Sequence, residues 1–205
     1  IVSDTVHVTG FPPDDPFETD GFYFMLGVVD PEDAVEEVDE DNNTVSLNLS
    51  WVGRQNIFED PFSTDAGWTG FAPGRWERDE AMAGGGDFGF PDPAQDTTDG
   101  EDNMLLGYDI GGDYENNISS TRWVTSPTID CGVFRDVTLG FQRWLNVENN
   151  FWDDAFIEVF DGAEWQELWH NPDVWLTDDE WTPQEFDVSA FADGNEQFQV
   201  RFGMG

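Results

Sequence analysis

Short segments rich in β-branched and aromatic residues recur along the second half of this chain, and glycine, proline, asparagine or aspartate separates each from the next. Around Asp161-Gly162, alternating apolar residues flank a dipeptide that is typical of hairpin turns. No apolar pattern with a helical period extends beyond a turn or two. The pattern predicts an all-β sandwich, with strands near residues 103–108, 122–126, 137–146, 155–160, 165–170, 182–188 and 197–202.

The charge balance is extreme. Aspartate and glutamate number 45, all 7 basic residues are arginine, and the net charge is -38 at pH 7. Self-repulsion would destabilise such a chain, but at molar salt the screening length falls to roughly 3 Å. This composition predicts a protein of a halophilic microbe, an archaeon in particular; an acidic, calcium-rich surface protein from ordinary seawater is the alternative. Nucleic acid is not an expected partner, because its phosphates would be repelled.

The hydrophobic content of 38% is enough for a real core and argues against a disordered acidic tail. Cys131 is the single cysteine, so it has no intrachain disulfide partner, and we interpret it as a buried thiol. The chain has no signal peptide, lipidation motif or long apolar run, which predicts no membrane insertion. Its start at Ile1 suggests an excerpt or a processed product. Three sequons favour a glycosylated surface protein, at Asn42, Asn48 and Asn117.

The first quarter of the chain predicts a strand at residues 1–9 and a hairpin whose strands, 21–29 and 44–52, flank an acidic turn. Within it, the valine-rich, acidic, Asp-Asn-Asn pattern of residues 28–44 resembles the closing hairpin of the CARDB family of Ig-like modules from microbial surface proteins. The resemblance implies that residues 1–53 are a partial Ig-like module whose earlier strands are absent.

Residues 54–205 carry an ordered series of phrases, among them Phe58-Glu59, Asp96-Thr97-Thr98 with Gly100, Asn103-Met104-Leu105, Thr125-Ser126-Pro127 and the segments 137–144, 155–159, 165–169, 181–182 and 199–202. This series resembles the MAM family of adhesive jelly-roll domains and its microbial relatives. The resemblance implies a jelly-roll β-sandwich. The chain departs from the family in lacking disulfides, in carrying Thr97 where the family has histidine, and in ending before the family's last strand. Truncation and strand donation by a neighbouring subunit are both open explanations.

Carboxylates in loops are the candidate metal ligands, because Ca²⁺ prefers six to eight oxygen ligands. The family resemblance implies a cation near Glu59 and Asp96. Asp87, Asp92 and Asp154 are further candidate ligands, because they lie in adjoining glycine- and proline-containing loops or at the entrance to a strand. No EF-hand loop is present. A zinc site is not expected, because the two histidines are far apart in the sequence and Cys131 stands alone.

Catalysis is not predicted. The spacing of paired carboxylates used by sandwich glucanases is absent, and Glu158 lies on a strand without a partner. No serine or cysteine nucleophile motif occurs. Ten tryptophans could serve a carbohydrate-binding surface. We expect those on strands, Trp144, Trp165 and Trp169, to pack in the core, whereas Trp152 and Trp175 lie in polar loops and are the candidate surface contacts.

These features predict a non-catalytic, extracellular structural or adhesion protein on the surface of a halophilic microbe, with Ca²⁺ stabilising its loops. Its partners would be further copies of the chain, as a homo-oligomer, a filament or surface-layer neighbours. The alternative is a carbohydrate-binding accessory module of a secreted enzyme, with glycans as partners.

Overall fold

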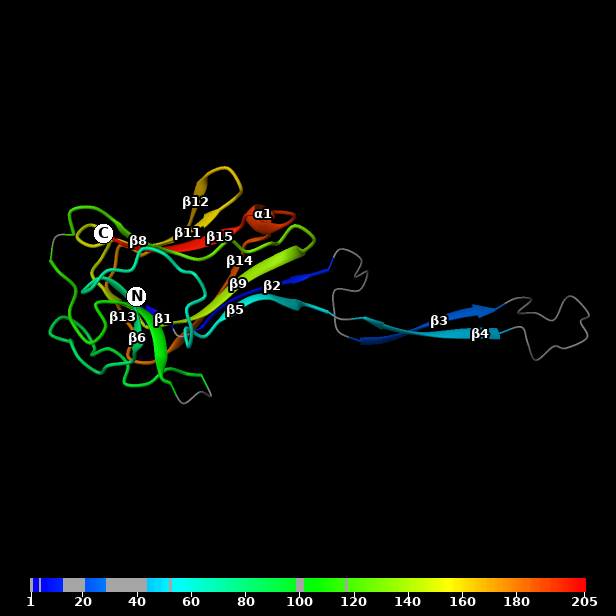
Figure 1. Ribbon diagram of the computed structural model, residues 1–205, viewed down its shortest axis with the longest axis horizontal. Coiled ribbons are helices and arrows are strands. Elements are labelled where there is room, and N and C mark those ends of the chain that lie inside the picture. The colour runs from blue at the N-terminus through cyan, green and yellow to red at the C-terminus, as the bar shows by residue number, and fades with distance from the viewer. Residues whose placement is uncertain are drawn as a thin grey trace, which may run out of the picture.

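The structure is a computed structural model, and it describes residues 2–3, 5–12, 21–28, 44–51, 53–98, 102–116 and 118–205 (Figure 1). At 2–3, 21–28 and 44–51 only the backbone is described. Strands dominate this part of the chain, and its one helix, α1 (Ser189–Ala192), is a single turn. The prediction of an all-β sandwich is confirmed.

Two four-stranded antiparallel sheets form the sandwich. The first sheet has the order β12 (Trp165–His170), β11 (Ala155–Phe160), β15 (Gln199–Met204) and β8 (Arg122–Thr125). The second has the order β14 (Thr182–Asp187), β9 (Arg135–Arg143), β2 (Val6–Phe11) and β5 (Gln55–Asp60). Figure 1 shows the first sheet above the second.

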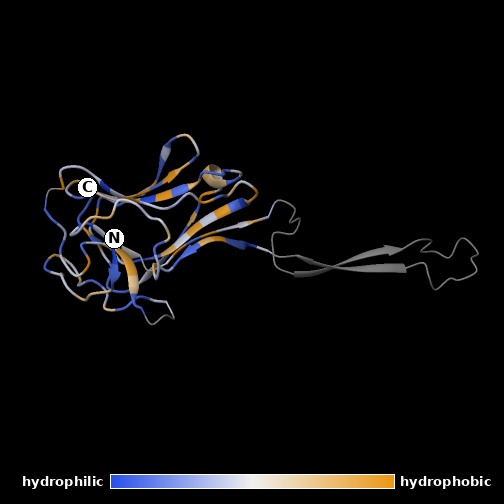
Figure 2. Cartoon of the chain, viewed as in Figure 1, coloured by the Kyte–Doolittle hydropathy of each residue, from blue (hydrophilic) through white to orange (hydrophobic). Residues whose placement is uncertain are grey.

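The core lies between these sheets because their strands alternate in polarity. In β11 the buried residues Ala155, Ile157 and Val159 alternate with partly buried ones, and Figure 2 shows the same alternation of hydrophobic and hydrophilic residues along neighbouring strands. The two sheets meet where the ring of Phe141 on β9 stands edge-on to that of Phe202 on β15, with centroids 5.3 Å apart. Burial of such side chains is the main stabilising contribution to a sandwich.

A smaller antiparallel sheet packs against one part of this core. Its order is β1 (Val2–Ser3), β7 (Met104–Tyr108) and β6 (Trp76–Glu80). Trp76 is 1% exposed, lies 6.5 Å from the ring of Phe202, and donates its indole N–H to the carbonyl of Arg122 at 2.8 Å. β6 does not stand out in the sequence, because Trp76 is its one buried residue and the four that follow are charged.

The division of the chain at residue 53 needs correction at its N-terminal end. β2 lies between β9 and β5, with Val8 opposite both Leu139 and Phe58. The first residues therefore contribute to the sandwich itself, where non-local pairing places them, and do not join a separate Ig-like module. The predicted hairpin is found as β3 (Gly21–Val28) and β4 (Thr44–Trp51), which pair with each other in a two-stranded sheet. That this hairpin belongs to an Ig-like module stays a prediction.

The end of the described chain lies inside a sheet. β15 has hydrogen-bonded neighbours on both sides, and Gly205 exchanges two backbone hydrogen bonds of 2.8 Å with Asp154. The outer strands of the two main sheets are β12, β8, β14 and β5. An unpaired edge at the final strand is thus not seen, and the lack of the family's last strand stays a prediction.

One buried carboxylate supports a loop that crosses the core. Asp60 is 2% exposed and accepts hydrogen bonds of 2.8 Å from the backbone N–H of Phe62 and from the indole N–H of Trp68. Burial nevertheless raises the pKa of Asp60 above the ordinary value of 3.8. The folded state therefore binds protons more tightly at this site than the unfolded chain does.

Because the pKa of Asp60 is higher in the folded protein than in the unfolded chain, its contribution to the free energy of unfolding should rise as the pH falls through the folded pKa towards the ordinary value of 3.8 at fixed salt. Asp60 contributes roughly 1.4 kcal/mol for each unit by which folding raises its pKa. Urea unfolding at several pH values, compared with the Asp60→Asn variant, measures it. A variant whose pH slope equals that of the wild type would refute the assignment.

Candidate functional site

A two-stranded ribbon at one end of the sandwich brings two loops together. The predicted strand 137–146 is interrupted: β9 ends at Arg143, and β10 (Asn146–Val147) pairs with β13 (Leu176–Thr177). The loop after β10 and the loop before β13 therefore lie side by side, joined by a 3.3 Å hydrogen bond from the N–H of Asn150 to the carbonyl of Pro172.

Asn171 fixes both loops to the sandwich. Its side chain is buried, its Oδ1 accepts the N–H of Ala155 at 2.8 Å, and its Nδ2 donates to the carbonyls of Glu148 and Asp153 at 3.0 Å each. The amide thus bonds to backbone groups of the loop after β10 and of β11. Because these hydrogen bonds go to backbone groups, they hold the loop in place whatever side chains it carries.

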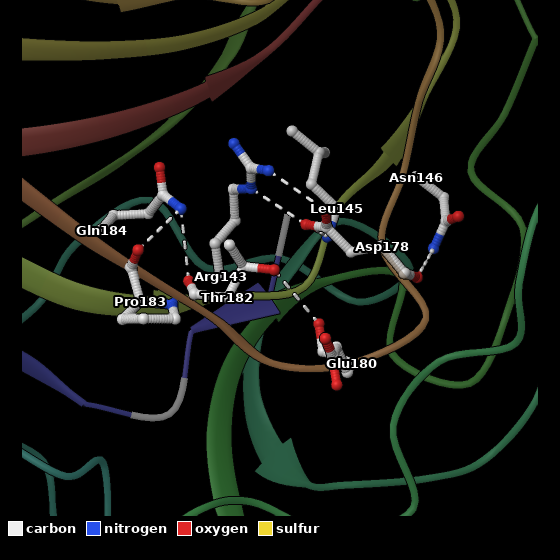
Figure 3. A network of polar contacts seen from close by, with 8 residues as sticks. All are labelled: Arg143, Leu145, Asn146, Asp178, Glu180, Thr182, Pro183 and Gln184. Atoms are coloured by element: carbon white, nitrogen blue, oxygen red, sulfur yellow. Dashed lines mark hydrogen bonds and ion pairs between the residues drawn. The ribbon is translucent and has the colours of Figure 1, made fainter.

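An ion pair braces the end of the same ribbon, where Asp178 follows β13 (Figure 3). Arg143 binds Asp178 through two bonds, Nε to Oδ2 at 2.9 Å and Nη2 to Oδ1 at 3.1 Å, and the two side chains are only 13% and 12% exposed. Oδ2 of Asp178 also accepts the N–H of Leu145 at 2.9 Å. This two-bond geometry fixes orientation as well as distance, so it sets where the chain leaves β13.

The braced loops carry a group of exposed apolar side chains, which we call the aromatic apex: Phe151, Trp152, Val174 and Trp175. Their exposed fractions are 76%, 69%, 59% and 53%. The rings of Phe151 and Trp152 pack edge to face with centroids 4.7 Å apart. The exposure expected for Trp152 and Trp175 is found. Phe151 and Val174 were not among the predicted surface contacts, although each is adjacent in the sequence to a tryptophan that was.

The tryptophans expected in the core are placed differently. Trp144, Trp165 and Trp169 are only partly buried, and Trp165 lies against the guanidinium of Arg201, 4.0 Å from its ring centre. Among the residues whose side chains the structure describes, the buried indoles are those of Trp68 and Trp76, which lie outside the predicted strands. Strand position alone does not decide burial, because each strand of a sandwich also has an outward face.

The predicted metal ligands lie in different places. Glu59 accepts a hydrogen bond from Asn56 on β5, Asp154 lies 2.7 Å from Nε2 of His170, and Asp96 accepts the hydroxyl of Thr98 at 2.5 Å. Asp87 and Asp92 share one loop, in which Asp92 accepts the N–H of Gly111 at 2.7 Å.

Within the part of the chain that the structure describes, no group of three or more histidine, cysteine, aspartate or glutamate side chains is arranged to hold a metal ion. The calcium site therefore stays a prediction. The sequons are not tested either: Asn42 and Asn117 lie outside the described residues, and for Asn48 on β4 only the backbone is described.

Cys131 is buried and free, as predicted. Burial raises the pKa of its thiol to about 12, so the thiolate that nucleophilic chemistry requires is scarce at neutral pH. The absence of catalysis stays a prediction.

No helix among the described residues is long and apolar enough to cross a membrane. Comparison with known proteins finds no matching family model, and no curated protein or solved structure matches the chain significantly.

Proposed function

We propose that this chain is a non-catalytic adhesion module that contacts a partner surface through the aromatic apex. The observation that carries the proposal is the exposure of four large apolar side chains, each more than half exposed, on two loops that buried polar groups hold in place. Exposed apolar side chains that are grouped on the surface of a protein often mark an interaction site.

The chemistry of the apex suits an anchor. Tryptophan and phenylalanine bury a large area while losing few rotatable bonds, and aromatic residues dominate measured binding hot spots. Because Asn171 and the Arg143–Asp178 pair already fix the loops, little ordering cost is added on binding.

We take a second copy of the chain as the partner. The net charge of -38 repels two copies at low salt, and screening at molar salt would allow an apolar contact to form. On this proposal the chain is a MAM-like jelly roll on the surface of a halophilic microbe, and calcium ions bridge carboxylates where copies meet.

We predict that the Trp152→Ser/Trp175→Ser double variant self-associates at least about tenfold more weakly than the wild type, because each indole buries substantial area in a contact. Sedimentation equilibrium at molar salt, with calcium and with chelator, measures the change. Phe71→Ser is the matched control, since Phe71 is 38% exposed and lies outside the apex. A wild type that stays monomeric in every condition would overturn the homotypic contact.

Carbohydrate binding is the second candidate. The apex is flanked by Asn149 and Asn150 on the loop that carries Phe151 and Trp152, so stacking faces and polar groups for hydroxyls lie close together. A monomeric wild type that binds soluble polysaccharide in affinity electrophoresis, with binding lost in the double variant, would favour this candidate.

A further inference from the structure

Two further aromatic side chains are exposed close to the aromatic apex. Phe88 and Phe90 lie in the loop between β6 and β7, and they are 73% and 46% exposed. Both line a cavity of about 140 Å³ together with Asp153, which directly follows Trp152 in the sequence. The loop of the two phenylalanines therefore lies beside one of the two loops that form the aromatic apex.

A hydrogen bond fixes this neighbouring loop to the ribbon. The backbone N–H of Phe90 donates to Oδ1 of Asn146 at 3.1 Å, and Asn146 is the first residue of β10. A Cβ at Gly89 would lie 2.7 Å from the same oxygen, so a side chain at this position would displace the Asn146 amide. Asn146 thus joins the loop of Phe88 and Phe90 to the strand that leads into the aromatic apex.

The two phenylalanines make the apolar surface unusually large for a monomer. At about 200 Å² for a fully exposed aromatic side chain, the three rings of the aromatic apex expose roughly 400 Å², within the range of about 300–600 Å² for the largest apolar patch of typical monomers. Phe88 and Phe90 raise this area to roughly 630 Å², above that range. Two copies in contact would bury about 1,300 Å² of aromatic surface, enough for a stable interface of about 1,200–2,000 Å².

The best counterpart for this surface is the same surface on another copy. Among the residues whose side chains the structure describes, the other exposed large apolar residues are Phe71, Met82 and Val133, which come from three separate segments. The loops beside the ribbon are therefore where each copy offers several exposed apolar side chains together. When a surface contacts itself, a two-fold axis relates the two copies, and the assembly closes at two subunits.

We propose that the aromatic apex, Phe88 and Phe90 form one contact surface, the extended apex, which binds the extended apex of a second copy in a closed two-fold dimer. The inference rests on the proposed function, in which a second copy is the partner, and it adds the second loop and the number of subunits. Because both copies carry a large negative charge, the dimer should form at molar salt and dissociate as the salt concentration falls.

Sedimentation equilibrium of the whole chain at molar KCl tests the surface. We expect the wild type to reach a limit of two copies and Phe88→Ser/Phe90→Ser to raise the Kd of the dimer at least about tenfold, since aromatic anchors dominate binding energy. Phe71→Ser, the matched control, should leave the Kd unchanged. The double variant should unfold in urea like the wild type, because both phenylalanines are exposed and the hydrogen bond to Asn146 comes from the backbone.

This inference and the proposed function fail in different ways. If Trp152→Ser/Trp175→Ser weakens self-association and Phe88→Ser/Phe90→Ser does not, the homotypic contact holds and the extended apex is refuted. Species larger than two copies that accumulate with rising concentration would refute the two-fold closure. A wild type that stays monomeric at every salt concentration would overturn the homotypic contact and the dimer together. If that monomer co-sediments with phosphatidylcholine vesicles, the partner of the surface is a lipid and not a second copy.

Discussion

Phe202→Ala is expected to lower the free energy of unfolding by about 4 kcal/mol, the largest effect that we predict for a single substitution. Phe202 is fully buried on β15, in the middle of the first sheet. Its ring is stacked on Trp68 with centroids 6.0 Å apart and stands edge-on to Phe141 at 5.3 Å. Because it contacts the opposite sheet and the loop that Asp60 supports, its neighbours cannot all move to fill the space left behind.

Urea unfolding at fixed molar salt measures this loss, with Phe151→Ala as the matched control. Phe151 is the same residue type at 76% exposure, and its truncation should change stability by less than about 0.5 kcal/mol. A loss below roughly 1 kcal/mol in Phe202→Ala would contradict the packing of the two sheets, because such a value is typical of a surface position.

Asp178→Ala should cost about 3 kcal/mol, since it leaves the guanidinium of Arg143 partly buried and unpaired and removes the acceptor for the N–H of Leu145 (Figure 3). The effect on function should follow the effect on structure. The backbone N–H of Asp178 bonds to the carbonyl of Leu145 at 3.0 Å, so loosening this end of β13 also loosens the loop that carries Trp175.

Asp179→Ala is the control for this prediction, because the neighbouring carboxylate is exposed. Urea unfolding gives the stability of each variant, and the Arg143→Ala/Asp178→Ala cycle gives the coupling between the two partners. If the double variant loses as much as the two single variants added together, the pair contributes nothing beyond its separate groups, and the brace is not what holds the ribbon.

Much of the strand content follows from local pattern. The β12 strand was predicted with its observed bounds, and the Asp161-Gly162 turn is found between β11 and β12, with Gly162 at a φ of 97° and Oδ1 of Asp161 accepting the N–H of Ala163. Alternation with a period of two is a property of neighbouring residues, so it can be recognised in the sequence. The exposure of Trp152 was predicted from its polar neighbours, and the burial of Cys131 from its being the single cysteine of the chain.

The arrangement of strands depends on pairing between distant residues. β2 lies between β5 and β9, and Val6 is paired with Asp60 on one side and Phe141 on the other. Nothing in residues 6–11 distinguishes a central strand of the sandwich from the end of a preceding module. The first residues were therefore assigned to a separate module, because the packing of the whole core decides which strands pair and local sequence does not show it.

The fold class, the strands with clear alternation and the exposure of Trp152 and Trp175 can be predicted from local sequence, because they depend on the order of polar and apolar residues nearby. Which of the 45 acidic residues have a specific role depends instead on contacts that form in the folded chain. Asp178 and Asp179 are chemically identical neighbours in a polar turn, yet one pairs with Arg143, 35 positions away, and the other faces solvent. The difference lies in what the fold places beside each carboxylate, since an ion pair depends on distance in space and leaves no trace in the local sequence.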